Sequence, residues 1–332
     1  MQRFINQSDH VVEDMLAGYV KAHPLITYAG TEQRVVSYKQ KFKNKVGLVS
    51  GGGSGHEPAF LGYVGKNMLD AVAVGEVFSS PTANAFLDAF KEAEQGAGVA
   101  CLFGNYAGDN MNVNMAVMMA EDEGIHVTCV KANDDISSSP KETKEKRHGI
   151  AGGVYMWKIA GAKAAMGASL DEVIMTAQKA VDHTRSICAG LSPCTIPDVG
   201  HPNFEIKAGT YEFGIGHHGE PGMDVQEITT AHTIVERMMT AIEEDMHFIE
   251  DEEVSIIISG LGATPLMELY IIYNEVQCYL DKRNIRIYHP FIGNYVTSLD
   301  MNGIAITVMK LDTELKELLD YPADCPALHQ GS

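Results

Sequence analysis

Apolar residues follow two alternating patterns along the first half of the chain. Short runs in which nearly every residue is apolar occur at 46–50, 99–103 and 125–130. Longer segments at 83–93 and 112–123 repeat their apolar residues at helical spacing. The short runs predict buried strands and the longer segments predict helices. Their alternation predicts β-α-β units and a mostly parallel sheet.

The pattern changes near residue 184. Residues 189–203 are rich in glycine, proline and serine, a composition typical of loops. Helices are then predicted at 231–243 and 266–281, and strands at 254–259 and 304–310. A chain of 332 residues commonly forms two domains. We therefore predict two α/β domains with mostly parallel or mixed sheets, residues 1–183 and 184–332.

Charge and composition restrict the possible partners. The chain has 25 Lys and Arg against 44 Asp and Glu, a formal net charge of −19. The electric field of this negative charge repels nucleic acid and anionic membranes, so we expect the chain to bind neither directly. No signal peptide is recognisable, and no apolar stretch reaches the roughly 20 residues that span a bilayer. The six cysteines lack zinc-site or disulfide spacing, and a cytoplasmic location is expected.

A glycine-rich segment, Gly51-Gly-Gly-Ser-Gly-His-Glu-Pro58, directly follows the first predicted strand. The carboxyl ends of parallel strands are where α/β folds bind ligands, and glycines let the backbone approach a ligand closely. The segment lacks the Lys and hydroxyl residue of a P-loop, and a tight turn is the alternative. His56 favours a site, because an imidazole can act as a base near neutral pH.

A carboxylate follows the next predicted strand. Asn105-Tyr-Ala-Gly-Asp109 would place Asp109 at the same edge of the sheet as His56. The segment on its own is also a good turn sequence. The two side chains together favour a ligand site.

The second half contains paired histidines in a glycine-rich segment, with Glu220 close by. Imidazole can act as a metal ligand, a base or a nucleophile. No third and fourth ligand stand at a familiar spacing, so we expect no metal. The residues alone do not distinguish His217 from His218.

Two other features are assigned structural roles. Asp134 and Asp135 follow a predicted strand, where we expect a turn. Met115, Met118 and Met119 lie in a predicted helix, where we expect core packing rather than a binding surface.

Seven motifs, in order, resemble the dihydroxyacetone-binding subunit of dihydroxyacetone kinases. They are Gly51-Gly-Gly-Ser-Gly-His-Glu-Pro58, Ser79-Ser-Pro-Thr82, Asn105-Tyr-x-Gly-Asp109, Ser192-Pro-Cys-Thr-x-Pro197, Gly216-x-His-Gly-Glu-Pro-Gly222, Leu261-Gly-Ala-Thr-Pro-Leu266 and Thr297-Ser-Leu-Asp-Met301. The resemblance extends from about residue 5 to the C-terminus.

The resemblance implies a two-domain α/β homodimer that binds dihydroxyacetone without a cofactor or metal. It implies that His218 forms a hemiaminal with the ketone, that His56 acts as a base and that Asp109 assists beside the ligand hydroxyls. Gly53, Ser54, Gly55 and Ser80 would line the pocket. Glycerol has no electrophilic carbonyl, so a covalent bond to histidine would exclude it.

Three departures from the kinase pattern bear on the step after ligand binding. The kinase sequence Lys-Asn-Tyr-Thr-Gly-Asp is replaced by Gly104-Asn-Tyr-Ala-Gly-Asp109, which removes a cation and a hydroxyl. The segment that ends in Gly-Arg-Arg-Gly becomes residues 137–149, expected to be a charged, mobile loop. The kinase Ser-Pro-Thr-Pro-Asp becomes Ser80-Pro-Thr-Ala-Asn84.

These departures favour a sensor over an enzyme. We expect a coactivator that binds dihydroxyacetone and then associates with a DNA-binding transcriptional regulator of the kinase operon. The alternative is the dihydroxyacetone-binding subunit of a phosphotransferase-dependent kinase, whose partner is a nucleotide-binding subunit. A glycerol-selective or sugar-binding module is a third interpretation. The chain has no P-loop or kinase signature and should not phosphorylate anything alone.

Overall fold

The computed structural model describes residues 3–202 and 204–331, and the chain divides into two compact units. The first unit contains the chain up to Ala132, Gly153–Ala180 and the chain from Glu317. The second unit contains Asn133–Gly152 and Val181–Lys316. Asn203, the last residue of the loop predicted at 189–203, lies outside the described residues.

This division differs from the predicted domains 1–183 and 184–332 in two segments and in the boundary, which falls after Ala180. Asn133–Gly152 belongs to the second unit, where the backbone N–H of Ile136 donates to the Ser186 carbonyl at 3.0 Å. The C-terminal segment belongs to the first unit, where the backbone N–H groups of Lys66 and Asp324 each donate to the other residue's carbonyl. Both segments are placed by backbone pairing between residues far apart in sequence.

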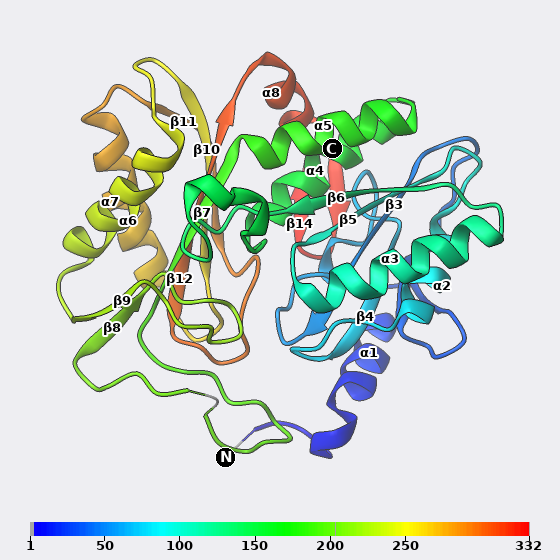
Figure 1. Ribbon diagram of the computed structural model, residues 1–332, viewed down its shortest axis with the longest axis horizontal. Coiled ribbons are helices and arrows are strands. Elements are labelled where there is room, and N and C mark those ends of the chain that lie inside the picture. The colour runs from blue at the N-terminus through cyan, green and yellow to red at the C-terminus, as the bar shows by residue number, and fades with distance from the viewer. Residues whose placement is uncertain (1–2, 203, 332) are drawn as a thin grey trace. The chain divides into compact units, whose positions relative to one another are not determined.

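The first unit contains a mixed six-stranded sheet in the order β1-β2-β4-β3-β5-β6 (Figure 1). Its strands are β1 (Ile26–Ala29), β2 (Val35–Tyr38), β3 (Gly47–Ser54), β4 (Ala71–Val77), β5 (Val99–Gly104) and β6 (Val127–Ala132). β4, β3, β5 and β6 pair with one another in parallel. β2 pairs antiparallel with both β1 and β4. The parallel β-α-β core predicted from the apolar runs is confirmed.

The helices of the first unit accompany this sheet. They are α1 (Val11–Ala22), α2 (Ala83–Ala93), α3 (Ala107–Asp122), α4 (Gly152–Ala165) and α5 (Leu170–Asp182), together with the short 3-10 helices Ser8–His10 and Leu61–Tyr63. Thr82 caps α2 by accepting a hydrogen bond from the Ala85 N–H at 3.0 Å. Ser169 and Glu172 form the reciprocal capping box at the start of α5. A two-stranded sheet, β13 (Ala323–Cys325) and β14 (Leu328–Gln330), completes the unit.

Helices α2 and α3 lie side by side and share one hydrophobic core with the sheet (Figure 1). The inner face of α3 consists of Val113, Ala116 and Ala120, all buried. The prediction of core packing for the methionines of this helix is wrong for Met115 and Met118, which are exposed. Met119 is partly buried and packs against the core as predicted, and the small residues Ala116 and Ala120 let α3 pack closely.

The second unit contains another mixed six-stranded sheet, in the order β11-β10-β12-β7-β8-β9. Its strands are β7 (Thr184–Gly190), β8 (Thr210–Phe213), β9 (Asp224–Glu227), β10 (Glu253–Gly260), β11 (Arg286–Gly293) and β12 (Gly303–Leu311). Only β10 and β11 pair in parallel among the described strands of this sheet. The helices are α6 (Ala231–Met246), α7 (Leu266–Asp281) and the 3-10 helix Lys141–Lys146, and α8 (Thr313–Asp320) runs from this unit into the first.

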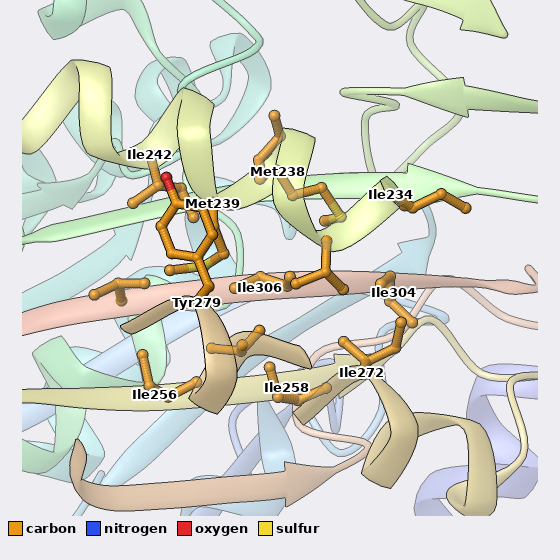
Figure 2. Packing of buried hydrophobic residues seen from close by; sticks show 14 of the residues in the cluster. Ile234, Met238, Met239, Ile242, Ile256, Ile258, Ile272, Tyr279, Ile304 and Ile306 are labelled. Atoms are coloured by element: carbon orange, nitrogen blue, oxygen red, sulfur yellow. The ribbon is translucent and has the colours of Figure 1, made fainter. Parts of the chain in front are cut away.

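Helices α6 and α7 pack against this sheet through an apolar layer (Figure 2). Met238 and Met239 from α6 lie in the same buried cluster as Ile256 of β10 and Ile306 of β12. The cluster is continuous because successive turns of α6 present apolar side chains at i, i+4 and i+8. The pattern that predicted the helix is therefore the pattern that holds it to the sheet.

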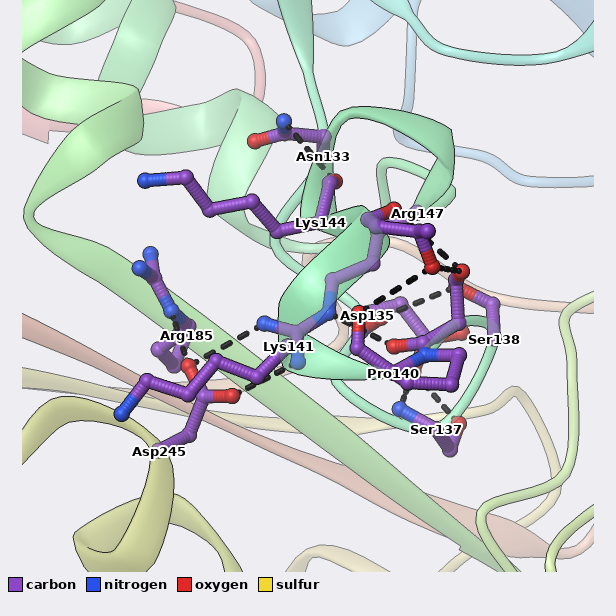
Figure 3. A network of polar contacts seen from close by, with 12 residues as sticks. Asn133, Asp135, Ser137, Ser138, Pro140, Lys141, Lys144, Arg147, Arg185 and Asp245 are labelled. Atoms are coloured by element: carbon purple, nitrogen blue, oxygen red, sulfur yellow. Dashed lines mark hydrogen bonds and ion pairs between the residues drawn. The ribbon is translucent and has the colours of Figure 1, made fainter.

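Residues 137–149 form a tethered segment instead of the mobile loop that their charges predicted (Figure 3). The Arg147 guanidinium is buried and donates two hydrogen bonds to the Asp245 carboxylate, at 3.1 and 2.6 Å. Arg185 donates to the same carboxylate at 2.5 Å. The paired charges fix the segment, because breaking such a buried pair leaves an uncompensated ion.

No helix in residues 3–202 or 204–331 is both long and apolar enough to cross a membrane.

The core of the second unit predicts a contrast between two methionines. Met239 is fully buried and Met267 is 72% exposed, and both are helical. Met239→Ala should lower the free energy of unfolding by about 2–5 kcal/mol, because it removes buried apolar atoms and leaves a cavity. Met267→Ala, the matched control, should change it by less than about 0.5 kcal/mol. Urea unfolding measures both, and equal losses would contradict the packing described.

Candidate functional site

The glycine-rich segment is part of a strand rather than a loop. Strand β3 continues through Gly51, Gly52 and Gly53 to Ser54. A Cβ added to Gly52 would lie 2.1 Å from the Phe60 ring, and one on Gly53 would lie 2.7 Å from the Ser79 nitrogen. The glycines therefore let neighbouring groups approach the strand. The turn comes only at Gly55, whose φ of +100° favours glycine.

The residues that end β3 are largely buried. The Ser54 hydroxyl donates to the Gly75 carbonyl at 2.8 Å and retains the capacity to accept. The His56 ring is buried and stacks on Phe78 with ring centroids 5.0 Å apart. This stacking fixes the plane of the imidazole. His56 is thus held by packing at the carboxyl end of β3.

Ser80 and Asp109 come from different parts of the first unit and lie side by side. Ser80 lies between β4 and α2, and Asp109 follows β5 at the start of α3. The Ser80 hydroxyl donates to the Asp109 carboxylate at 3.0 Å, and the Asn112 amide donates to the Ser80 hydroxyl at 3.3 Å. Asp109 lies in the first turn of α3, where the helix dipole favours a negative charge. The turn considered for this segment is instead a helix start. β3 and β5 are neighbours, so His56 and Asp109 follow adjacent parallel strands.

The paired histidines lie in a compact loop of the second unit, after β8. The backbone N–H of Gly216 donates to the Glu220 carbonyl at 3.0 Å, and Gly219 adopts a φ of +84°. A Cβ on Gly216 would lie 2.2 Å from a Glu220 carboxylate oxygen. The glycines therefore allow the loop to bend until the Glu220 carboxylate lies against Gly216 and His218.

The His218 side chain is fixed by Glu220. Its Nδ1 lies 2.9 Å from one oxygen of the Glu220 carboxylate, and its backbone N–H donates to the other at 2.9 Å. Burial raises the pKa of Glu220, but the hydrogen bonds and charge of His218 outweigh it and lower the pKa to about 2. The carboxylate is therefore ionised and favours a proton on Nδ1. In that tautomer, Nε2 carries the imidazole lone pair.

The two histidines of the pair differ in environment. The His218 side chain is 28% exposed, whereas His217 is only 3% exposed. Burial, aided by the charge of His218, lowers the pKa of His217 to about 3, so its ring is neutral. The His217 carbonyl accepts a hydrogen bond from the Ser298 hydroxyl. His217 thus anchors the loop and His218 presents its ring at the surface of the second unit.

Asp134 and Asp135 do not form the expected turn. Both are buried. Asp134 accepts from the backbone N–H of Gly152 at 2.9 Å and from the Ser186 hydroxyl at 2.5 Å. Asp135 lies in an isolated bridge with Ser186. The acids are buried because Asn133–Gly152 packs against β7, which sequence spacing does not reveal.

Asp135 and His148 join the electrostatic surroundings of His218. Burial raises the pKa of Asp135 to about 7, with a contribution from the negative charge of Glu220. Burial also lowers the pKa of His148, a group that interacts with the charges of Glu220 and His218. Neither residue is among the predicted site residues, and Asp135 is predicted to lie in a turn. The signal available was the pair of acids directly after a strand.

The structure distributes the predicted site residues over both units. Gly53, Ser54, Gly55, His56, Ser80 and Asp109 belong to the first unit, and His218 belongs to the second. Within the described chain, no group of three His, Cys, Asp or Glu side chains is arranged to hold a metal ion.

The raised pKa of Asp135 predicts how stability depends on pH. A carboxyl with a higher pKa in the folded state stabilises the fold while protonated, and this contribution is lost as pH rises from about 4 to about 7. Asp135→Asn should remove the loss, so the unfolding free energy should fall less between pH 5 and pH 8 than in the unaltered chain, by about 2 kcal/mol. Urea unfolding at both pH values measures this. The exposed Asp122→Asn is the control, and parallel pH profiles for Asp135→Asn and the unaltered chain would refute the prediction.

Sequence comparisons agree with the motifs. A family model for the Dak1 domain matches residues 17–327. The dihydroxyacetone-binding subunit DhaK of PTS-dependent dihydroxyacetone kinase 2 from Listeria innocua is 43% identical over 328 residues, which cover 98% of each chain.

Structural comparisons lead to the same family. The solved structure of the dihydroxyacetone kinase operon co-activator Dha-DhaQ is similar with a TM-score of 0.91 and 30% identity, over 96% of this chain and 99% of that one. The dihydroxyacetone kinase of C. freundii gives a TM-score of 0.91 and 32% identity, over 99% of this chain and 60% of the kinase. The predicted fold class and resemblance are confirmed: the chain belongs to the Dak1 domain family, together with dihydroxyacetone-binding subunits of dihydroxyacetone kinases.

Proposed function

We propose that this chain captures dihydroxyacetone covalently on His218 and that the captured ketone serves as a signal. The observation that carries the proposal is the pairing of the His218 Nδ1 with the Glu220 carboxylate at 2.9 Å. This contact favours the tautomer in which Nε2 is the nucleophile. The identity of the ligand is inferred from the family, because the similar protein of Listeria innocua is a dihydroxyacetone-binding subunit.

Capture would proceed by addition to the carbonyl. The Nε2 lone pair attacks the central carbon of dihydroxyacetone, a carbon–nitrogen bond forms, and the carbonyl π electrons move to the oxygen. The oxygen gains a proton and becomes the hydroxyl of a hemiaminal. That proton comes from water, and the ring keeps its own proton on Nδ1, so the adduct is an imidazolium paired with the Glu220 carboxylate and no cofactor is needed.

The Glu220 carboxylate would stabilise the charge that develops during this addition. The ring becomes cationic when Nε2 forms its bond, and the ionised carboxylate lies directly on Nδ1. Hydrogen bonds between charged partners in a partly desolvated site are stronger than neutral ones. Glycerol offers no carbonyl and would gain nothing from this arrangement.

We assign the remaining residues the roles that the family resemblance implies. Asp109, oriented by the Ser80 hydroxyl, would accept hydrogen bonds from ligand hydroxyls. His56 would move a proton near the ligand, with its ring plane fixed by Phe78. The glycines of β3 and the Ser54 hydroxyl would line the ligand pocket.

The residues around Asp109 favour a sensor over a phosphoryl-transfer subunit. β5 ends at Gly104 and α3 begins at Ala107, so both of these departures from the kinase motif lie within five residues before Asp109. Glycine cannot supply the cation that a lysine would offer to ligand oxygens or an incoming phosphoryl group. The structural similarity to a kinase operon co-activator supports a role with a DNA-binding regulator. We propose a cytoplasmic homodimer, with the regulator making all DNA contacts because of the chain's charge of −19.

The second candidate is the dihydroxyacetone-binding subunit of a phosphotransferase-dependent kinase. The 43% identity to such a subunit from Listeria innocua favours it, since identity to the co-activator is 30%. Both candidates share ketone capture and differ only in the fate of the captured ketone. Their separation therefore requires a measurement of turnover.

Covalent capture predicts a bond between labelled atoms. Dihydroxyacetone labelled with ¹³C at its central carbon should show one-bond coupling to nitrogen in protein with ¹⁵N-labelled histidine. His218→Ala should abolish the coupling, and Glu220→Gln should weaken capture about tenfold by removing the negative charge. The exposed His232→Ala is the control. Coupling that persists in His218→Ala would refute the proposed nucleophile.

The sensor proposal predicts negligible phosphorylation. The chain is mixed with dihydroxyacetone, the nucleotide-binding subunit of the Listeria innocua kinase and its phosphoryl donor. That kinase's own dihydroxyacetone-binding subunit serves as positive control. The unaltered chain should turn over at least a hundredfold more slowly, and Gly104→Lys combined with Ala107→Thr should raise turnover. Turnover by the unaltered chain at the rate of the positive control would establish the kinase alternative instead.

A further inference from the structure

Helix α3 carries three methionines on its outer face. Met111, Met115 and Met118, hereafter the methionine stripe, are 65%, 52% and 62% exposed. Their spacing of four and three residues places them on one side of the helix, opposite the buried Val113, Ala116 and Ala120. Contiguous exposed apolar side chains of this kind mark interaction surfaces. Methionine suits such a surface because its flexible side chain adapts to different contacts.

The charged residues of α3 itself are all acidic, and Lys91 of α2 is paired with Glu123, just after the helix, at 2.7 Å. No Lys or Arg occurs between Lys91 and Lys131 in the sequence. Over the same interval α3 contains Asp109 in its first turn and two exposed acids, Glu121 and Asp122, in its last turn. These last two follow Met118 by three and four residues, so they extend the same helix face. The outer face of α3 is thus apolar along its middle and negative at its C-terminal end.

We propose that the methionine stripe docks a basic amphipathic helix of a protein partner. The partner's apolar residues would contact the three methionines, and its Lys and Arg residues would lie against Glu121 and Asp122. Recognition of an amphipathic helix by apolar side chains at helical spacing is a recurrent binding mode. The acidic ends repel anionic membranes and nucleic acid, so neither fits this surface.

The position of the stripe connects it to the proposed ligand site. Met111 lies two residues after Asp109, and Asn112, in the same turn, donates to both the Ser80 hydroxyl and the Pro81 carbonyl. A ligand that bonds to Asp109 would restrain this first turn and the methionines that come after it. This coupling rests on the proposed function. Docking itself does not, because it is argued only from the exposed methionines and the acids of α3.

The test uses a fluorescein-labelled helical peptide composed only of leucine and lysine, with leucines on one face. Fluorescence anisotropy should show saturable binding to the full chain. Changing Met111, Met115 and Met118 together to Gln keeps helix propensity and side-chain length but removes the apolar contact. The affinity should fall at least tenfold. Met166→Gln combined with Met175→Gln, at exposed methionines elsewhere in the first unit, should leave it unchanged.

Charge is tested separately. Glu121→Gln combined with Asp122→Asn should weaken peptide binding and flatten its dependence on salt concentration, since fewer ion pairs are screened. A Leu-rich peptide with glutamate in place of lysine should not bind. Equal affinity for both peptides would overturn the basic character assigned to the partner.

Three results would overturn the proposal. The first is unchanged peptide affinity in the triple methionine variant. The second is a change of oligomeric state in that variant, measured by light scattering, which would assign the stripe to a second copy of this chain. The third is binding of vesicles of phosphatidylserine and phosphatidylcholine that requires the three methionines.

The ¹³C–¹⁵N coupling measurement on the same triple variant separates this inference from the proposed function. Coupling retained together with lost peptide binding is expected. Coupling absent from the unaltered chain, with peptide binding still dependent on the methionines, would reject ketone capture and leave docking intact.

Discussion

The contact between His218 and Glu220 is the interaction on which the proposed chemistry depends. A carboxylate on Nδ1 fixes the ring orientation, favours one tautomer and stabilises positive charge on the ring. The fold supplies this contact locally, because glycines at 216 and 219 let the loop bend until Glu220 faces back toward His218. The buried, neutral His217 anchors the same loop. In the proposed mechanism, this local arrangement makes His218 a nucleophile for a ketone.

The surrounding architecture serves to hold small loops in place. In the first unit, the parallel strands β3 and β5 end at Ser54 and Gly104, and His56 and Asp109 follow them along the chain. The bulky rings of Phe60 and Phe86 occupy space that the strand glycines leave open. In the second unit, the Arg147–Asp245 pair secures the segment that buries Asp135 beside Glu220. Both units thus depend on contacts between residues that are separate in the sequence. The same dependence on distant contacts explains which features the sequence concealed.

Local features of the fold were predictable from sequence. Apolar spacing indicated the central strands and the helices α2, α3, α6 and α7. The assignment of residues 133–152 and the C-terminal segment to their units was not predictable, because backbone pairing with partners far along the chain decides it. The sequence also indicated the histidine pair without ranking its members. Burial of His217 and exposure of His218 separate the two, and burial is a property of the folded chain.

One segment, from the end of β5 through α3, contains both the departures at Gly104 and Ala107 and the exposed methionines. In the proposed account, ligand binding at Asp109 restrains this segment, and the partner binds to it. The segment does not support phosphoryl transfer. The central claim remains the covalent bond, and a crystal structure of the chain soaked with dihydroxyacetone tests it most directly. The account predicts continuous density from the His218 Nε2 to a tetrahedral ligand carbon, with Glu220 still on Nδ1. A bound ketone with a planar carbonyl and no density joining it to His218 would contradict it.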